Sequence, residues 1–149
     1  MGLDMYLNRS HYVWTVRDGE KPKVKVSGIK GLKNKDVRFV KERIIYWRKS
    51  NQIHKWFVEK IQDGVDNCAT YYVDIEDLRN LLQDINSVLH NKKLSVDKLP
   101  TKTGFFFGSV DYDNYYWEDL ERSKLELEKE IKAYEKHGSK WEYEYRASW

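Results

Sequence analysis

The sequence feature that most constrains the fold is a run of apolar residues between positions 74 and 90. Its members recur three or four residues apart, the spacing of one face of an amphipathic helix: Leu78, Leu81, Leu82, Ile85, Val88 and Leu89. Asp74 stands before the run as a favourable N-cap, and Glu76 and Asp77 place negative charge in the first turn. Because a helix with one apolar face needs a surface to bury it against, the rest of the chain has to supply one.

Five other segments carry β-strand patterns. Apolar and polar residues alternate over residues 3–7, and the β-favouring stretch 11–17 follows as the second half of a hairpin or of a bent strand. Residues 70–73 are predicted to form a short strand, and the glycine-bounded residues 104–109, with three phenylalanines, another. The tail 141–146 alternates aromatic with charged residues, which is typical of an edge strand.

Two further helices are predicted. One spans about residues 36–63 and ends at Gly64, and the other spans about residues 114–137 and ends at Gly138. The order of the elements predicts an α+β fold, with one mostly antiparallel sheet covered by about three helices. At 149 residues, the chain is predicted to form one domain, 1–149.

Charge and composition exclude several classes of protein. The 27 basic and 24 acidic residues nearly balance, which argues against nucleic acid as the partner. Basic residues do gather in residues 17–35, which are predicted to form a loop or hairpin outside the core, because alternating lysines are not buried unpaired. Cys68 is the only cysteine, so no internal disulfide forms. Since no run approaches the roughly 18 apolar residues of a membrane span, we expect a cytoplasmic protein without a membrane partner.

No residue constellation in the sequence dictates a reaction. The four histidines are scattered singly, so neither a metal site nor a cofactor is predicted. Cys68 lacks a histidine that the sequence places beside it, and Gly104 and Gly108 bracket phenylalanines instead of forming a phosphate-binding loop. Whether the protein is an enzyme is left open, and the missing signatures favour a protein that is not.

One row of residues on the predicted helix 36–63 combines the chemistry of a ligand pocket. Spacings of three or four make its members neighbours on one helix face: Arg43, Trp47, Asn51, His54 and Val58. Arginine pairs with anions, tryptophan stacks on planar rings, and asparagine and histidine hydrogen-bond ring edges or hydroxyls. The row is therefore predicted to line a concave surface, with Trp47 only partly buried. The alternative is that Trp47 and His54 pack at the edge of the core.

Further residues complete the predicted ligand site. Arg48 adds a second cation next to the row, Phe106 offers an aromatic surface, and Asp66 and Asn67 lie in the turn after Gly64. The glycines around Phe106 are expected to allow a ligand or another backbone to approach closely.

Several stretches together resemble a family of small proteins encoded by tailed bacteriophages and prophages. The resemblance rests on MGLDMYL at residues 1–7, YWRKSNQIHKWF at 46–57, DNC at 66–68 and LPTKTGFFFGS at 99–109, and it excludes residues 17–35. Most members of this family have no assigned function, and the resemblance implies no catalytic residues. Small accessory phage proteins often counter host defence, in some cases by sequestering cyclic-nucleotide or ADP-ribose-type signals.

The leading hypothesis is a phage accessory protein that sequesters a small anionic, nucleotide-derived ligand, plausibly a host immune signal, without turnover. A first alternative is a hydrolase of a phosphorylated or nucleotide small molecule that uses His54 as acid or base, with Asp66 nearby. A second is a protein–protein inhibitor or a nucleic-acid accessory protein that uses the aromatic segment or the lysine segment. A homo-oligomer is left open.

Overall fold

A computed structural model describes residues 2–14, 17 and 19–149. Its sheet contains β1 (Asp4–Tyr12), β2 (Phe39–Arg48), β3 (Thr70–Val73) and β4 (Trp141–Ser148), in the order β2-β1-β4-β3. Every neighbouring pair is antiparallel. The predicted α+β fold with one antiparallel sheet is therefore confirmed.

Three helices of at least ten residues accompany the sheet: α1 (Asn51–Lys60), α2 (Ile75–His90) and α4 (Asn114–His137). A single turn, α3 (Ser95–Lys98), follows the 3₁₀ turn Lys92–Leu94, and a second 3₁₀ turn covers Asn34–Asp36. Asp74 caps α2 as predicted, since its side chain accepts a hydrogen bond from the Glu76 amide and Asp77 completes a capping box. Over the described residues, none of the helices is both long enough and apolar enough to cross a membrane.

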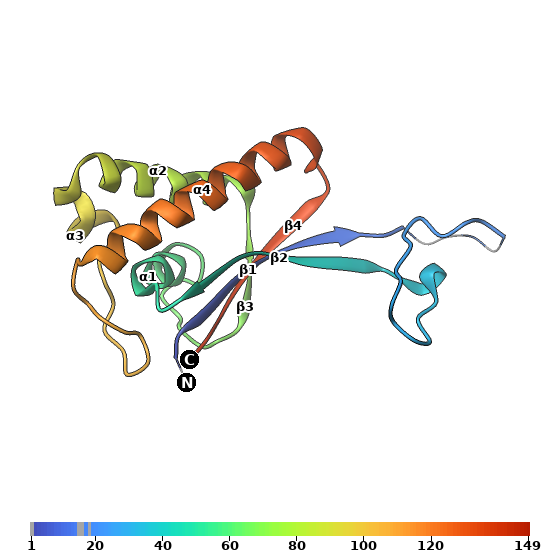
Figure 1. Cartoon of the computed structure of the whole chain (residues 1–149), viewed down its shortest axis with the longest axis horizontal. Coiled ribbons are helices and arrows are strands. Elements are labelled where there is room, and N and C mark those ends of the chain that lie inside the picture. Colours follow the sequence, from blue (N-terminus) through green and yellow to red (C-terminus); the bar gives the residue numbers. More distant parts are fainter. Residues whose placement is uncertain (1, 15–16, 18) are drawn as a thin grey trace.

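The core lies between the helices and one face of the sheet. Alternate residues of β1 supply its floor, where Leu3, Met5 and Leu7 have no exposed surface. The Tyr145 ring of β4 stacks on Phe57 of α1, with ring centroids 3.8 Å apart. α4 crosses above the sheet and packs against α2 (Figure 1). All three longer helices contribute buried residues to this one core.

The predicted helix 36–63 is wrong over its first half, because residues 39–48 form strand β2 and the helix begins only at Asn51. Ile45 and Trp47 alternate inward along β2, while Tyr46 faces outward. Tyr46 lies seven positions, or two helical turns, before Ile53 of α1, so a strand followed by a helix imitated one long helix. Pairing of β2 with β1 overrides that local pattern.

Three other expectations need correction. Residues 104–109 form a turn and no strand, and Gly104 is required there because a Cβ atom would lie 2.6 Å from the Phe107 ring. The tail β4 is not an edge strand, since it pairs with both β1 and β3. Finally, β1 is one continuous strand to Tyr12 instead of two arms; of the predicted stretch 11–17, residues 15 and 16 lie outside the described residues.

The second face of the sheet carries no helix among the described residues. The alternation of β1 and β4 points Tyr6, Asn8, Arg146 and Ser148 to this side. A β-bulge between Leu7 and Asn8 inserts one extra residue in β2, so that Arg43 pairs with Asn8. Without the bulge, Arg43 would face the same side of the sheet as the buried Ile45. We call this side the open face.

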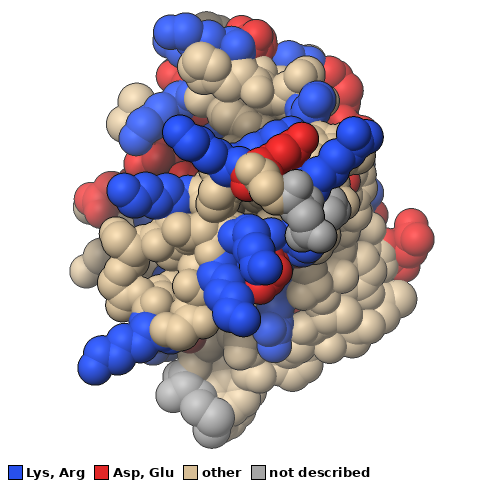
Figure 2. Space-filling model, turned by 90° about the vertical axis from the view of Figure 1, so that its right-hand side faces the viewer, with Lys and Arg blue, Asp and Glu red and all other residues tan. Residues whose placement is uncertain are grey.

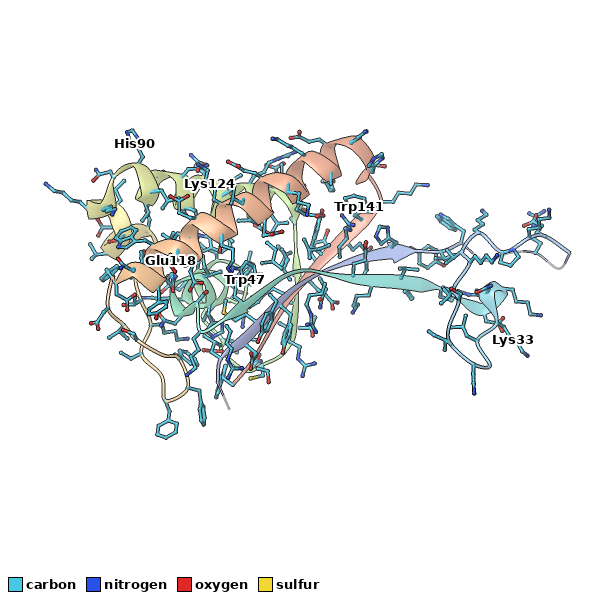
Figure 3. The ribbon with its side chains drawn as sticks, in the orientation of Figure 1. Lys33, Trp47, His90, Glu118, Lys124 and Trp141 are labelled. Atoms are coloured by element: carbon cyan, nitrogen blue, oxygen red, sulfur yellow. The ribbon has the colours of Figure 1, made fainter. Side chains whose placement is uncertain are left out.

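Residues 13–38 connect β1 to β2, and the described ones among them (13–14, 17 and 19–38) project far from the helices (Figure 1). Lys33 lies at the far end of this connection, well away from the body of the molecule (Figure 3). Hydrogen bonds within the connection shape it, including one from the Val26 amide to the Asn34 side chain at 2.9 Å. The described residues of 17–35 are thus outside the core, as predicted, and we call residues 13–38 the basic arm.

Candidate functional site

The structure does not bring the predicted row into one concave wall. Trp47 has no exposed surface, which contradicts its expected partial burial. Its indole Nε1 donates a hydrogen bond to the Ser123 hydroxyl of α4 at 2.7 Å, and Figure 3 places it between the sheet and α4. Arg43 and Trp47 both lie on β2, but the bulge opposite Leu7 and Asn8 puts Arg43 on the open face while Trp47 lies in the core. The alternative interpretation of Trp47 as a core residue is correct.

Asn51 ties a loop to the first turn of α1. Its Nδ2 donates to the carbonyls of Phe107 and Ser109 at 2.9 and 2.8 Å, and its Oδ1 accepts from the Lys102 amide at 2.9 Å. The side chain is almost fully buried. Both donor hydrogens and one acceptor site of its amide are therefore used to fix residues 101–109.

His54 and Asp66 meet in a buried polar cluster. The His54 Nε2 lies 3.0 Å from Asp66 Oδ2, and its Nδ1 lies 2.8 Å from the Tyr145 hydroxyl. Lys102 donates to the same Asp66 oxygen at 2.6 Å, and the Trp149 indole donates to the other oxygen at 3.0 Å. The cluster joins α1, the loop after it, the 101–109 loop and the end of the chain.

The protonation states of the cluster follow from burial and charge. Burial lowers the pKa of His54 below its ordinary value, although Asp66 opposes this effect. Burial favours protonated Asp66, but the Lys102 hydrogen bond and the adjacent His54 lower the Asp66 pKa overall. Burial keeps the pKa of Tyr145 well above its ordinary value. His54 is therefore neutral at pH 7, donates from Nε2 to the carboxylate and accepts from the Tyr145 hydroxyl at Nδ1.

This arrangement removes the geometric basis for His54 as a catalytic base. Both ring nitrogens are engaged and the side chain has no exposed surface. The carboxylate that would orient it is already balanced by Lys102. The cluster fastens the ends of several segments together, which is a structural role.

The two remaining predicted residues of this region also serve local structure. Asn67 is exposed in a turn, where its side-chain oxygen accepts from the Ala69 amide and the Tyr71 hydroxyl, both at 3.1 Å. Phe106 is half-buried, packs against the core, and offers its carbonyl to the Leu3 amide at 3.0 Å. Neither lines a described cavity.

A cavity of about 250 Å³ lies where β2 meets α1. Its wall includes the predicted residues Arg48 and Asn51, and also the Gln52 side chain, whose buried Nε2 has no hydrogen-bond partner among the described residues. Three aspartates from residues 111–119 line the same cavity. Arg48 is paired with Asp4 at 2.9 Å. Carboxylates outnumber the cations here, so the cavity does not suit an anion.

The open face holds a depression of different chemistry, with a volume of about 350 Å³. It is lined by Tyr6, Asn8, Arg43, Arg146 and Ser148. The Arg43 guanidinium lies 4.8 Å from the centroid of the Tyr6 ring. On the opposite side of β1, Arg146 is the cross-strand partner of Tyr6. Two arginines, on the strands on either side of β1, thus line one depression together with Tyr6.

Both arginines of the depression lack an ion pair among the described residues. Arg9, Arg48, Arg79 and Arg122 each pair with a carboxylate. Two carboxylates border the depression in register, Glu144 opposite Asn8 and Asp4 opposite Ser148. Glu144 accepts hydrogen bonds from Asn8 and Lys41, and Asp4 accepts from Tyr46 and Arg48. The lining of the depression itself therefore contains two cations and no anion.

Sequence reasoning selected Arg43 for this site but missed Tyr6, Asn8, Arg146 and Ser148. In residues 3–7 and 141–146, the alternation was used only to find residues that face the core. The other members of the same alternation could have indicated the depression, because alternate residues of paired antiparallel strands share one face of the sheet. The bulge that turns Arg43 to this face leaves no mark in the sequence.

Comparison with known proteins found no matching family model, no matching curated protein and no matching solved structure.

Proposed function

We propose that the protein binds a small anionic, nucleotide-derived ligand on the open face and releases it unchanged. Arg43 and Arg146 hold the anionic group, and Tyr6 lies beside the planar group. One observation carries this proposal: two arginines without ion pairs among the described residues line one depression with Tyr6, on a sheet face that no described helix covers.

Electrostatics support an anion at this place. Arg43 and Arg146 stand on strands that both neighbour β1, roughly 10 Å apart at the backbone. Both side chains line the same depression over β1, and an anion bound there would offset the repulsion between their charges. Arginine also offers a planar fork of donors that matches phosphate or carboxylate oxygens.

The lining supports binding without turnover. Asn8 and Ser148 supply neutral hydrogen-bonding groups, which suit hydroxyls or ring edges. The lining contains no imidazole, thiol or carboxylate to move a proton, and the Ser148 hydroxyl has no base beside it among these residues. A binder that keeps its ligand intact fits the sequestration of a signal nucleotide in a phage-infected bacterial cytoplasm.

Calorimetry with inorganic pyrophosphate and with ADP-ribose tests the proposal. We expect Arg43→Gln and Arg146→Gln each to weaken binding at least tenfold, and the double variant more strongly. Arg79→Gln on α2 removes the same charge from a paired arginine and is the matched control, for which we expect unchanged binding.

Equal binding by the parent and by the double variant would refute the site. After incubation, heating the protein and analysing the released ADP-ribose distinguishes sequestration from hydrolysis. Recovery of intact ADP-ribose agrees with the proposal, whereas recovery of cleaved products contradicts the part that excludes turnover.

A further inference from the structure

The net charge of the whole chain does not show how unevenly its basic and acidic residues are distributed. The basic arm contains eight lysines and arginines against three acidic residues, while the rest of the chain has more acidic than basic residues. Figure 2 looks onto the end of the molecule where the arm projects, and basic side chains gather there around few acidic ones. The near-balance of basic and acidic residues, which argued against nucleic acid, combines a basic arm with a remainder of the chain in which acidic residues outnumber basic ones.

The cations of the arm are free to meet an external partner. None of the described arm residues forms an ion pair. Arg38 donates only to the carbonyls of Lys35 and Val37, and Glu20 accepts from the Arg17 amide, so these bonds stay within the arm. Lys21, Lys23 and Lys25 are all exposed.

Aromatic rings stand at the base of the arm on the side of the cations. Tyr12, Trp14 and Phe39 are 48%, 59% and 62% exposed. The Tyr12 ring is 5.1 Å from Trp14 and 5.4 Å from Phe39, measured between centroids. A hollow of about 410 Å³ beside Tyr12 and Trp14 includes Lys23 and Val24 of the arm in its wall. Contiguous exposed apolar groups rimmed by polar residues are typical of interaction sites.

We infer that the basic arm and these three rings bind single-stranded nucleic acid. Lysines along the arm follow the phosphates, and bases stack on the exposed rings of Trp14 and Phe39. A cationic track combined with exposed aromatic rings is what sequence-tolerant binding of single strands requires. An acidic protein surface would use the lysines but give no role to the three rings. This binding surface is separate from the open-face depression and does not depend on it.

Fluorescence anisotropy with a labelled oligothymidine of 20 nucleotides tests the inference across a series of salt concentrations. Because each phosphate contact on a single strand contributes roughly −0.7 to the slope of log affinity against log salt, we expect a clearly negative slope. Replacing Lys21, Lys23, Lys25 and Lys30 together by alanine should weaken binding at least tenfold at low salt and flatten the slope.

The matched control replaces four exposed lysines of the body by alanine: Lys60, Lys129, Lys132 and Lys136. It changes the net charge equally, and we expect less than a threefold effect. An equal loss in both variants would show general attraction and overturn a binding arm. Trp14→Ala, with an unchanged melting temperature, should weaken binding about tenfold by loss of stacking.

The remaining outcomes each contradict the inference. Tighter binding of the same oligothymidine annealed to its complementary strand, with no effect of Trp14→Ala, would identify a duplex partner. Competition by polyglutamate at the same charge concentration would identify an acidic polypeptide. Sedimentation of the parent as a dimer, and of Trp14→Ala as a monomer, would assign the rings to a second copy of this chain.

Discussion

Replacing Trp47 with alanine is expected to destabilise the protein strongly, because the indole is a buried part of the junction between β2 and α4. It has no exposed surface, and its ring lies 6.1 Å from that of Phe57. Truncation of such a ring costs about 3–5 kcal/mol of unfolding free energy. Loss of the donor to Ser123 adds to this, although Ser123 retains its own bond to the Asp119 carbonyl.

For a chain of this length, a loss of 3–5 kcal/mol lowers the melting temperature by roughly 10–20 °C. Urea unfolding followed by circular dichroism measures the free energy, and calorimetry measures the melting temperature. Trp14→Ala is the matched control because it removes the same atoms from an exposed position, and we expect a change within about 0.5 kcal/mol. A loss below 1 kcal/mol for Trp47→Ala would refute the interpretation of Trp47 as a core residue.

Three further predictions concern the buried polar groups. Burial lowers the pKa of His54 in the folded state, so the unfolded chain takes up a proton more readily than the folded one. The free energy of unfolding should therefore fall as the pH drops below about 6.5. Urea unfolding between pH 7.5 and 5 measures this dependence, and we expect His54→Gln to flatten it. Asp66→Asn should weaken the hold on Lys102 and cost about 1–3 kcal/mol, and limited trypsin digestion should cut after Lys102 faster than in the parent; an unchanged rate would argue against the anchoring role. Gln52→Met removes a buried amide nitrogen without a partner and should raise the free energy of unfolding by about 1 kcal/mol, whereas a loss of more than 1 kcal/mol would show that the amide is satisfied.

The parts of the fold that local chemistry determines were predictable from the sequence. Helix α2 has both a regular apolar period and a capping box at Asp74, so its start and its buried face follow from neighbouring residues. The paired strands at residues 3–7 and 141–146 follow in the same way from alternation. These patterns need no knowledge of distant contacts.

Strand β2 and the open face were not predictable in the same way, because non-local pairing decides them. Residues 39–48 combine apolar spacing that suits a helix with β-favouring side chains, and only β1 beside them selects the strand. Arg43 owes its outward direction to a bulge opposite Leu7 and Asn8. The candidate site was therefore assigned partly to the wrong element, even though Arg43 itself was selected.

The proposed function requires that an anion bind between Arg43 and Arg146 over Tyr6. Nuclear magnetic resonance of ¹⁵N-labelled protein, titrated with inorganic pyrophosphate, detects such binding residue by residue. We predict saturable shifts of the Tyr6, Asn8, Arg43 and Arg146 amides and of the two guanidinium Nε signals, with the amides of α1 and α2 unchanged. Shifts confined to the basic arm, or no saturable shift at the depression, would contradict it.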